Sequence, residues 1–143
     1  MSDARITVEA LQERITRGPY HQWLGLKVLS VAPDAVELRA TWREEWVANA
    51  ERRHTHGGIL AALVDLAADW ALFSRLGRAV PTIDMRVDYH RAAAPGDLVA
   101  KGQVLKFGSQ FSVCEAQVLD TEGRVIASGR GTYFTAPLEP PSA

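Results

Sequence analysis

One segment of twenty residues, residues 57–76, restricts the folds open to this chain more than any other feature. Its sequence is GGILAALVDLAADWALFSRL, and apolar side chains occur on nearly every face of the helix that this pattern predicts. A helix that is apolar all round is normally buried. Gly77 follows as a typical C-terminal stop. We therefore expect a central helix that the rest of the chain must cover.

The rest of the chain consists mainly of segments with the alternating pattern of β-strands. The clearest is AVELRATW at residues 35–42, in which apolar and polar side chains alternate, as in a strand with one buried face. Further segments typical of strands are residues 25–31, 82–90, 97–107, 110–120 and 124–134. A short helix is expected over residues 7–17, ended by Gly18-Pro19, and a loop over residues 43–56.

The order of these elements predicts an α+β fold. One helix and two strands precede the apolar helix, and four strands follow it. Turn-like sequences at residues 32–34, 108–109 and 120–123 favour hairpins, and hence an antiparallel sheet. Such a sheet wrapped around one long central helix is the simplest arrangement that buries both. The chain fits a single domain, residues 1–143, with a tail at residues 137–143 that we expect to fray.

Composition argues against several classes of function. The 16 basic and 17 acidic residues give a net charge of −1, which does not favour general binding to nucleic acid or membranes. Cys114 is the only cysteine, so we expect no internal disulfide and no cysteine-based zinc site, but a buried, inert thiol. The N-terminus lacks the features of a secretory signal, and no apolar stretch approaches the roughly 20 residues of a membrane span. A cytoplasmic protein is therefore expected.

The start of the apolar helix is a candidate site for a carbonyl or phosphate oxygen. The first turn of a helix leaves backbone N–H groups without partners and carries the positive end of the helix dipole. Gly57 and Gly58 have no side chains to obstruct these groups, as an oxyanion hole requires. The alternative is that the two glycines only permit a tight turn or close packing.

Two carboxylates interrupt the apolar helix. Asp65 lies eight residues after Gly57, and aspartate is seldom buried without a structural partner or a chemical task. It is a candidate general base. Asp69 lies one turn further on the same face, where the two carboxylates would influence each other's titration. The alternative for Asp69 is exposure to solvent or an ion pair with one of three arginines, Arg52, Arg53 and Arg86.

A metal site and a serine nucleophile are not expected. His54 and His56 are two residues apart on a loop, which is a weak spacing for metal ligands, and the strands supply no histidine cluster. The sequence has no G-x-S-x-G motif, phosphate loop or dinucleotide fingerprint. A carboxylate working with the helix start is the chemistry that these residues favour.

The segment HGGILAALVD at residues 56–65 resembles the HGG…D signature of hotdog-fold acyl-CoA thioesterases. The closest resemblance is to the phenylacetic-acid-degradation type within the 4-hydroxybenzoyl-CoA thioesterase superfamily. The segments TIDMRVDYHRAAAPGDLVA and LKFGSQFSVCEAQVLDTEGRVIASGRGTYF are similar to the later strands of this family, so the likeness covers about residues 20–135. It implies a hotdog fold and homodimers, or dimers of dimers, with active sites at the subunit interface. It implies no cofactor, because coenzyme A is part of the substrate.

The resemblance also implies roles for individual residues. Asp65 matches the catalytic carboxylate, a general base for water or a nucleophile toward the thioester carbonyl. The Gly57 N–H matches the group that polarises this carbonyl, and His56 matches the signature histidine that shapes the site. Arg91, Gly108 and Ser109 fall where family members often hold the nucleotide and pantetheine parts of coenzyme A. Gly58 at the helix start and Asp69 are further candidate substrate-binding positions, from their places on the helix and not from the resemblance. The alternatives for Arg91 and Ser109 are a solvated arginine and a hairpin residue.

Two positions depart from the family pattern. Many members have asparagine or glutamine six residues before the signature histidine, where it helps to position the attacking water. Here Ala50 occupies that place, and Asn49 takes the role only if the loop is shifted by one residue. The position four residues after the carboxylate is often serine or threonine, and here it is Asp69. An added charge there would affect Asp65 or the orientation of water.

We therefore expect an enzyme that hydrolyses an acyl- or aroyl-CoA to the free acid and coenzyme A. Trp46, Trp70 and Phe73 are candidates for lining an acyl pocket, although such aromatic residues more often belong to the core. The alternative is a non-catalytic acyl-CoA-binding protein of the same fold, a sensor or a carrier partner, because a fold does not fix a function. The carboxylate at Asp65 favours the enzyme.

Overall fold

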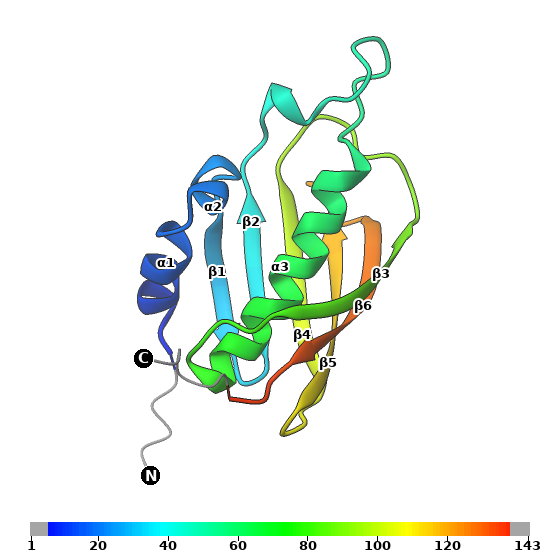
Figure 1. Ribbon diagram of the computed structural model, residues 1–143. Helices are drawn as coiled ribbons and strands as arrows, with labels where there is room; N and C mark the ends of the chain where they lie inside the picture. Colours follow the sequence, from blue (N-terminus) through cyan, green and yellow to red (C-terminus); the bar gives the residue numbers. More distant parts are fainter. Residues whose placement is uncertain (1–5, 138–143) are drawn as a thin grey trace, which may run out of the picture.

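The computed structural model describes residues 6–137, and it consists of one antiparallel sheet curved around one long helix (Figure 1). Its elements are α1 (Val8–Thr16), α2 (Pro19–Trp23), β1 (Lys27–Ala32), β2 (Ala35–Ala40), the 3₁₀ turn η1 (Glu44–Trp46), α3 (Gly57–Leu76), β3 (Thr82–Tyr89), β4 (Leu98–Lys106), β5 (Phe111–Leu119) and β6 (Val125–Phe134). This arrangement confirms the predicted α+β fold. The tail that is expected to fray lies, apart from its first residue, outside the described residues.

The six strands form one sheet in the order β1-β2-β4-β5-β6-β3, and every neighbouring pair is antiparallel. Short turns join β1 to β2, β4 to β5 and β5 to β6, as predicted. The connection through α3 carries the chain to β3 at the far edge of the sheet. Within residues 6–137 the outer edge of β3 has no strand beside it. An unpaired strand edge can accept a second chain.

Helix α3 packs across one face of the sheet and forms the centre of the core (Figure 1). Its buried residues are Leu60, Leu63, Val64, Ala67, Ala68, Ala71, Leu72 and Phe73. Gly102 of β4 permits the close approach, because a Cβ atom there would collide with the backbone carbonyl of Ala67. Cys114 of β5 is also buried, and burial raises the pKa of its thiol to about 12. The prediction of a buried thiol is confirmed.

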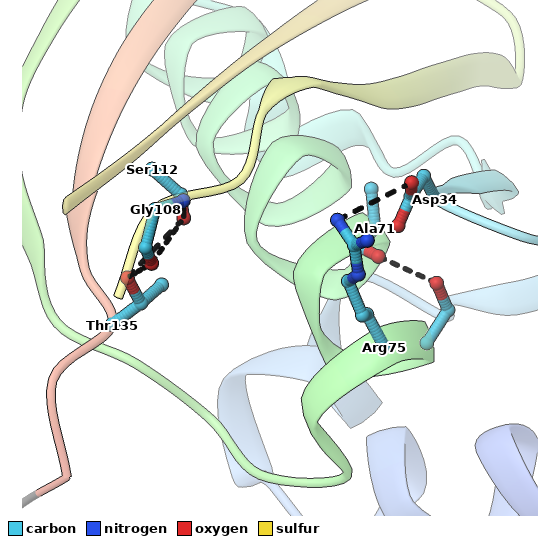
Figure 2. Close-up of polar contacts among 7 residues, drawn as sticks. Asp34, Ala71, Arg75, Gly108, Ser112 and Thr135 are labelled. Carbon is cyan, nitrogen blue, oxygen red and sulfur yellow. Dashed lines mark hydrogen bonds and ion pairs between the residues drawn. The ribbon is translucent and has the colours of Figure 1, made fainter. Parts of the chain in front are cut away.

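Helix α3 begins and ends where the sequence predicts. Gly77 follows it in the left-handed region, with φ of 69°, and its N–H donates to the carbonyl oxygen of Phe73 at 2.9 Å. An ion pair of 3.7 Å between Arg75 and Asp34 joins the last turn of the helix to the turn between β1 and β2 (Figure 2). Within the described residues, no helix combines the length and apolarity needed to span a membrane.

Two local features differ from the sequence prediction. Pro19 does not only end the first helix, because it also starts the second short helix, α2. Proline is well suited to a first helical position, since the N–H that it lacks would have no intrahelical partner there. Residues 43–56, expected to be an irregular loop, contain η1 and an isolated bridge between Val47 and Thr55.

Candidate functional site

The Asp65 carboxylate projects from the third turn of α3 and is held by two hydroxyl groups. Its Oδ1 atom accepts hydrogen bonds from the Thr82 hydroxyl at 2.8 Å and from the Tyr133 hydroxyl at 3.0 Å. Within residues 6–137, Oδ2 has no hydrogen-bond partner. Hydrogen bonds to an ionised carboxylate are about twice as strong as those between neutral groups. One oxygen is therefore fixed, and the other is available for chemistry.

The two hydroxyl groups come from adjacent strands. Thr82 is the first residue of β3, and Tyr133 lies near the end of β6, directly opposite it in the antiparallel pairing. Tyr133 is fully buried. Burial, together with the nearby Asp65 carboxylate, raises the pKa of the Tyr133 hydroxyl far above its ordinary value. Tyr133 therefore remains a protonated donor at every physiological pH.

Asp69 lies one turn after Asp65 and is half-buried. Its Oδ1 atom is buried, with no hydrogen-bond partner in the described part of the chain. Burial, and after it the nearby Asp65 carboxylate, raises the pKa of Asp69 to about 7. The Asp69 side chain therefore keeps its proton up to about neutral pH, and two negative charges do not face each other on α3 below that pH.

The alternative that Asp69 forms an ion pair with a nearby arginine is wrong. Arg53 pairs with Glu44 at 2.6 Å, and Arg86 pairs with Asp88 at 3.2 Å. No ion pair among residues 6–137 includes Asp69. The remaining alternative, an exposed Asp69, also fails, because the residue is half-buried and its Oδ1 atom is buried.

Replacing Asp69 by asparagine should stabilise the protein above neutral pH. The folded carboxyl group titrates near pH 7 and the unfolded one near 3.8, so the folded state binds more protons between these values. The free energy of unfolding therefore falls as pH rises through this window and levels off above it. We expect the advantage of Asp69→Asn over wild type to grow by about 3 kcal/mol between pH 5 and pH 8.5, measured by urea unfolding at one protein concentration.

A matched control is Asp88→Asn, which makes the same chemical change on the exposed face of β3. Its carboxylate is paired with Arg86 at the surface, where ion pairs contribute little. Its stability difference from wild type should stay within about 0.5 kcal/mol at both pH values. An Asp69→Asn advantage that is equal at pH 5 and pH 8.5 would show that Asp69 titrates as an ordinary aspartate.

The start of α3 presents one backbone donor that the chain itself does not use. His56 is the N-cap, and its Nδ1 atom accepts the N–H of Gly58 at 2.8 Å. The Gly57 N–H, in contrast, has no acceptor among residues 6–137. The Tyr89 hydroxyl donates to the Gly57 carbonyl oxygen at 3.2 Å. Gly57 thus offers a bare donor at the positive end of the helix dipole, whereas the Gly58 N–H is already occupied.

The distance between this donor and the carboxylate is set by the helix. Gly57 and Asp65 are eight residues apart on α3, which corresponds to about 12 Å along its axis. An oxyanion donor and a base that act on one carbonyl group must each lie about 3 Å from the reacting atoms. Gly57 and Asp65 of the same chain therefore cannot serve the same thioester group.

The positions expected to hold coenzyme A lie at opposite ends of α3. Arg91 follows β3 at the end of the sheet where Tyr89 contacts Gly57. Its side chain is exposed and forms no ion pair within the described residues. Ser109, in the turn between β4 and β5 at the other end, is also exposed.

Gly108, beside Ser109, is held by a small polar cluster (Figure 2). Its N–H donates to Oγ of Ser112 at 3.1 Å, and its carbonyl oxygen accepts from the Thr135 hydroxyl at 2.6 Å. Ser112 and Thr135 are buried. Both backbone groups of Gly108 therefore stabilise the turn, which leaves Ser109 as the more accessible residue for a ligand.

Asn49 has a structural role in the loop before α3. Its Oδ1 atom accepts the N–H groups of Glu51 at 2.9 Å and Arg52 at 3.0 Å, and its carbonyl oxygen accepts the N–H of Arg53 at 2.8 Å. This is a turn in which an asparagine side chain caps the backbone. The oxygen that would orient water is thus already used, and we leave Asn49 out of the proposed catalytic groups.

The three aromatic candidates for the acyl pocket pack mainly against other side chains of the chain. Trp46 and Phe73 are buried. Trp70 is half-buried, with its ring centroid 4.9 Å from that of Phe73 and 5.8 Å from that of His21. Their packing favours the core alternative.

Thr82 and Tyr133 are the two contacts of Asp65 that the sequence did not indicate. A buried aspartate predicts that partners exist, but these partners lie 17 and 68 residues away along the chain. One signal was present in GTYF at the end of the chain, because a tyrosine on the buried face of a strand needs a hydrogen-bond partner for its hydroxyl. Nothing in the sequence says that this partner is Asp65.

Comparisons with known proteins agree with the fold and show the family. The family model described as the thioesterase superfamily matches residues 53–127. A Halobacterium salinarum protein named as a candidate esterase is 34% identical over 122 residues, covering 78% of this chain and 80% of the relative. The medium/long-chain acyl-CoA thioesterase YigI of Escherichia coli is 27% identical over 132 residues, covering 81% and 84%.

Solved structures show the same architecture. The crystal structure of a protein described as from the thioesterase superfamily superposes with a TM-score of 0.86 at 48% identity, covering 89% of this chain and 96% of that one. Zebra fish thioesterase superfamily member 2 superposes with a TM-score of 0.80 at 27% identity, covering 92% and 99%. The chain belongs to the thioesterase superfamily and is a thioester hydrolase with the hotdog fold.

Proposed function

We propose that the protein hydrolyses acyl-CoA thioesters to the free acid and coenzyme A, with Asp65 as general base or nucleophile and the Gly57 N–H as oxyanion donor. The observation that carries this proposal is the Asp65 carboxylate in the middle of an apolar helix, with one oxygen held by two hydroxyl groups and the other without a partner in residues 6–137. Such a carboxylate is prepared to take a proton from water or to attack a carbonyl carbon.

Two copies of the chain would complete each site. Because Gly57 and Asp65 of one chain are about 12 Å apart along α3, the donor of one subunit has to meet the carboxylate of another. The free edge of β3 offers a surface for this contact, and Ile83 and Tyr89 on that strand are each 55% exposed. The proposal is thus a homodimer, or a dimer of dimers, with active sites at the interface, as the family resemblance implies.

The two-subunit arrangement would also bring the coenzyme A contacts together. Arg91 suits the phosphate groups of the nucleotide, since a guanidinium binds phosphate in bidentate geometry. Ser109 suits the pantetheine arm. Since they lie at opposite ends of α3, they would contact one coenzyme A from different subunits.

The first substrates to test are medium- and long-chain acyl-CoA esters, because YigI is named for them. Aroyl-CoA and phenylacetyl-CoA are the second group, because of the resemblance to the phenylacetic-acid-degradation type. That subtype and a cytoplasmic location remain predictions from the sequence.

A thiol-release assay with 5,5′-dithiobis(2-nitrobenzoic acid) on acetyl-, octanoyl-, palmitoyl-, benzoyl- and phenylacetyl-CoA tests the proposal. The buried Cys114 thiol, whose pKa is raised to about 12, should add no background. Release that saturates with one group of esters supports the enzyme and identifies its substrates. No release from any ester, with acyl-CoA binding shown by calorimetry, would favour the non-catalytic acyl-CoA-binding protein instead.

A further inference from the structure

The hydrogen bonds to Asp65 distinguish its two carboxylate oxygens. The bond that links a carboxylate to its side chain rotates easily, so an unrestrained Asp65 could present either oxygen. Here both hydroxyl donors reach Oδ1, from Thr82 at 2.8 Å and from Tyr133 at 3.0 Å. Within residues 6–137 no donor reaches Oδ2.

We propose that Tyr133 is a positioning residue for thioester hydrolysis, because its hydroxyl, together with that of Thr82, holds Oδ1 of Asp65 and leaves Oδ2 as the oxygen that meets water or the thioester carbonyl. This inference rests on the proposed catalytic role of Asp65. Tyr133 itself does not touch the substrate, and it acts only through the orientation of the carboxylate.

The structure around Tyr133 gives its hydroxyl a fixed place. Its side chain is 0% exposed, and a buried tyrosine hydroxyl needs a partner. The acceptors within reach are Oδ1 of Asp65 and, at 3.4 Å, the backbone carbonyl oxygen of the same residue. Gly131, two residues earlier on β6, leaves room for the ring, because a Cβ atom there would lie 2.9 Å from ring carbon Cε2 and from the hydroxyl oxygen.

The direction of the hydrogen bond is also fixed. Burial and the carboxylate next to it raise the pKa of the Tyr133 hydroxyl far above its ordinary value, so the group keeps its proton and donates it to the carboxylate oxygen. Tyr133 is therefore suited to orient a carboxylate and unsuited to take the proton of an attacking water molecule. Thr82, opposite Tyr133 on β3, supplies the second donor to Oδ1. With two hydrogen bonds on this oxygen, the Asp65 carboxylate cannot rotate about the bond to Tyr133 alone.

The test is a double-mutant cycle that combines Tyr133→Phe with Asp65→Asn in the full-length enzyme. Tyr133→Phe removes a single oxygen atom and keeps the ring, so we expect kcat to fall about tenfold while KM changes less than about twofold. In the Asp65→Asn background the same substitution should lower the residual rate by less than about twofold, because its effect runs through the carboxylate. Tyr20→Phe, at an exposed tyrosine of α2, is the matched control and should leave both constants unchanged.

The outcomes separate this inference from the proposed function. Near-normal turnover of folded Asp65→Asn would defeat the role of Asp65 itself. An inactive Asp65→Asn beside a fully active Tyr133→Phe, or equal losses from Tyr133→Phe in both backgrounds, would overturn the positioning role alone. Should Tyr133→Phe not fold, Thr82→Val tests the same anchoring of Oδ1 from the strand edge. A kcat loss confined to backgrounds that retain Asp65 would support it, and unchanged turnover would refute it.

Discussion

Asp65→Asn should lower kcat by at least about 100-fold and leave the fold intact. Removing a general base typically costs two to four orders of magnitude in rate. Asparagine has the same shape, and its side-chain oxygen can still accept both hydroxyl groups that now bind Oδ1. The amide nitrogen then takes the place of Oδ2, and it can neither accept a proton from water nor attack a carbonyl. Thiol release from the best substrate, with wild type measured in parallel, gives the ratio.

Stability measurements show whether the fall in kcat of Asp65→Asn comes from the missing carboxylate or from unfolding of the variant. Asp65→Asn also removes the charge that faces Asp69, one of the two causes that raise the pKa of Asp69. We therefore expect a thermal unfolding midpoint that is equal to that of wild type or higher. Asp88→Asn serves again as the control, since its carboxylate pairs with Arg86 at the surface and with no other side chain of residues 6–137. A folded Asp65→Asn protein with more than about a tenth of wild-type turnover would exclude Asp65 as the catalytic base.

Most of the fold could be predicted because its elements are defined by local patterns. Helix α3 has the bounds that the apolar run and Gly77 indicate, and the six strands follow the alternating segments. The order of strands in the sheet was not predictable, because pairing between β3 and β6 depends on contacts between segments far apart in the sequence. This is why Ile83 and Tyr89, in a strand that alternates like the others, are exposed at an edge.

The candidate site could be predicted only in part, for a similar reason. Asp65 and the glycines at the helix start stand out because carboxylates and paired glycines are unusual in an apolar helix. The partners that hold Asp65 come from the two strands β3 and β6, and their side chains meet only in the folded sheet. For Asp69 the sequence indicated partners that the folded chain does not provide. Arginines are plentiful in the sequence, but Arg53 and Arg86 form ion pairs with other carboxylates.

Gly57→Pro should lower kcat by about 100- to 1000-fold, the usual loss when one oxyanion donor is removed. Proline lacks only the N–H that has no acceptor among residues 6–137, and the first position of a helix is where proline is best tolerated. The preceding residue, His56, has φ of −58° and ψ of 135°, which is the extended conformation that a following proline favours. We therefore expect α3 to remain folded, with circular dichroism and unfolding midpoints close to those of wild type.

Gly57→Ala is the control that separates the donor from the added side chain. A Cβ atom at this position would lie 3.2 Å from ring carbon Cε1 of Tyr89, so any crowding against this ring is common to both variants. Alanine keeps the N–H, so its kcat should stay within a few-fold of wild type while that of Gly57→Pro falls. Equal losses in the two variants would assign the effect to crowding against Tyr89. If Gly57→Pro and Gly57→Ala both kept wild-type activity, the oxyanion would be stabilised by another group. The requirement for a second subunit to complete the site, which depends on the Gly57 N–H, would then fail.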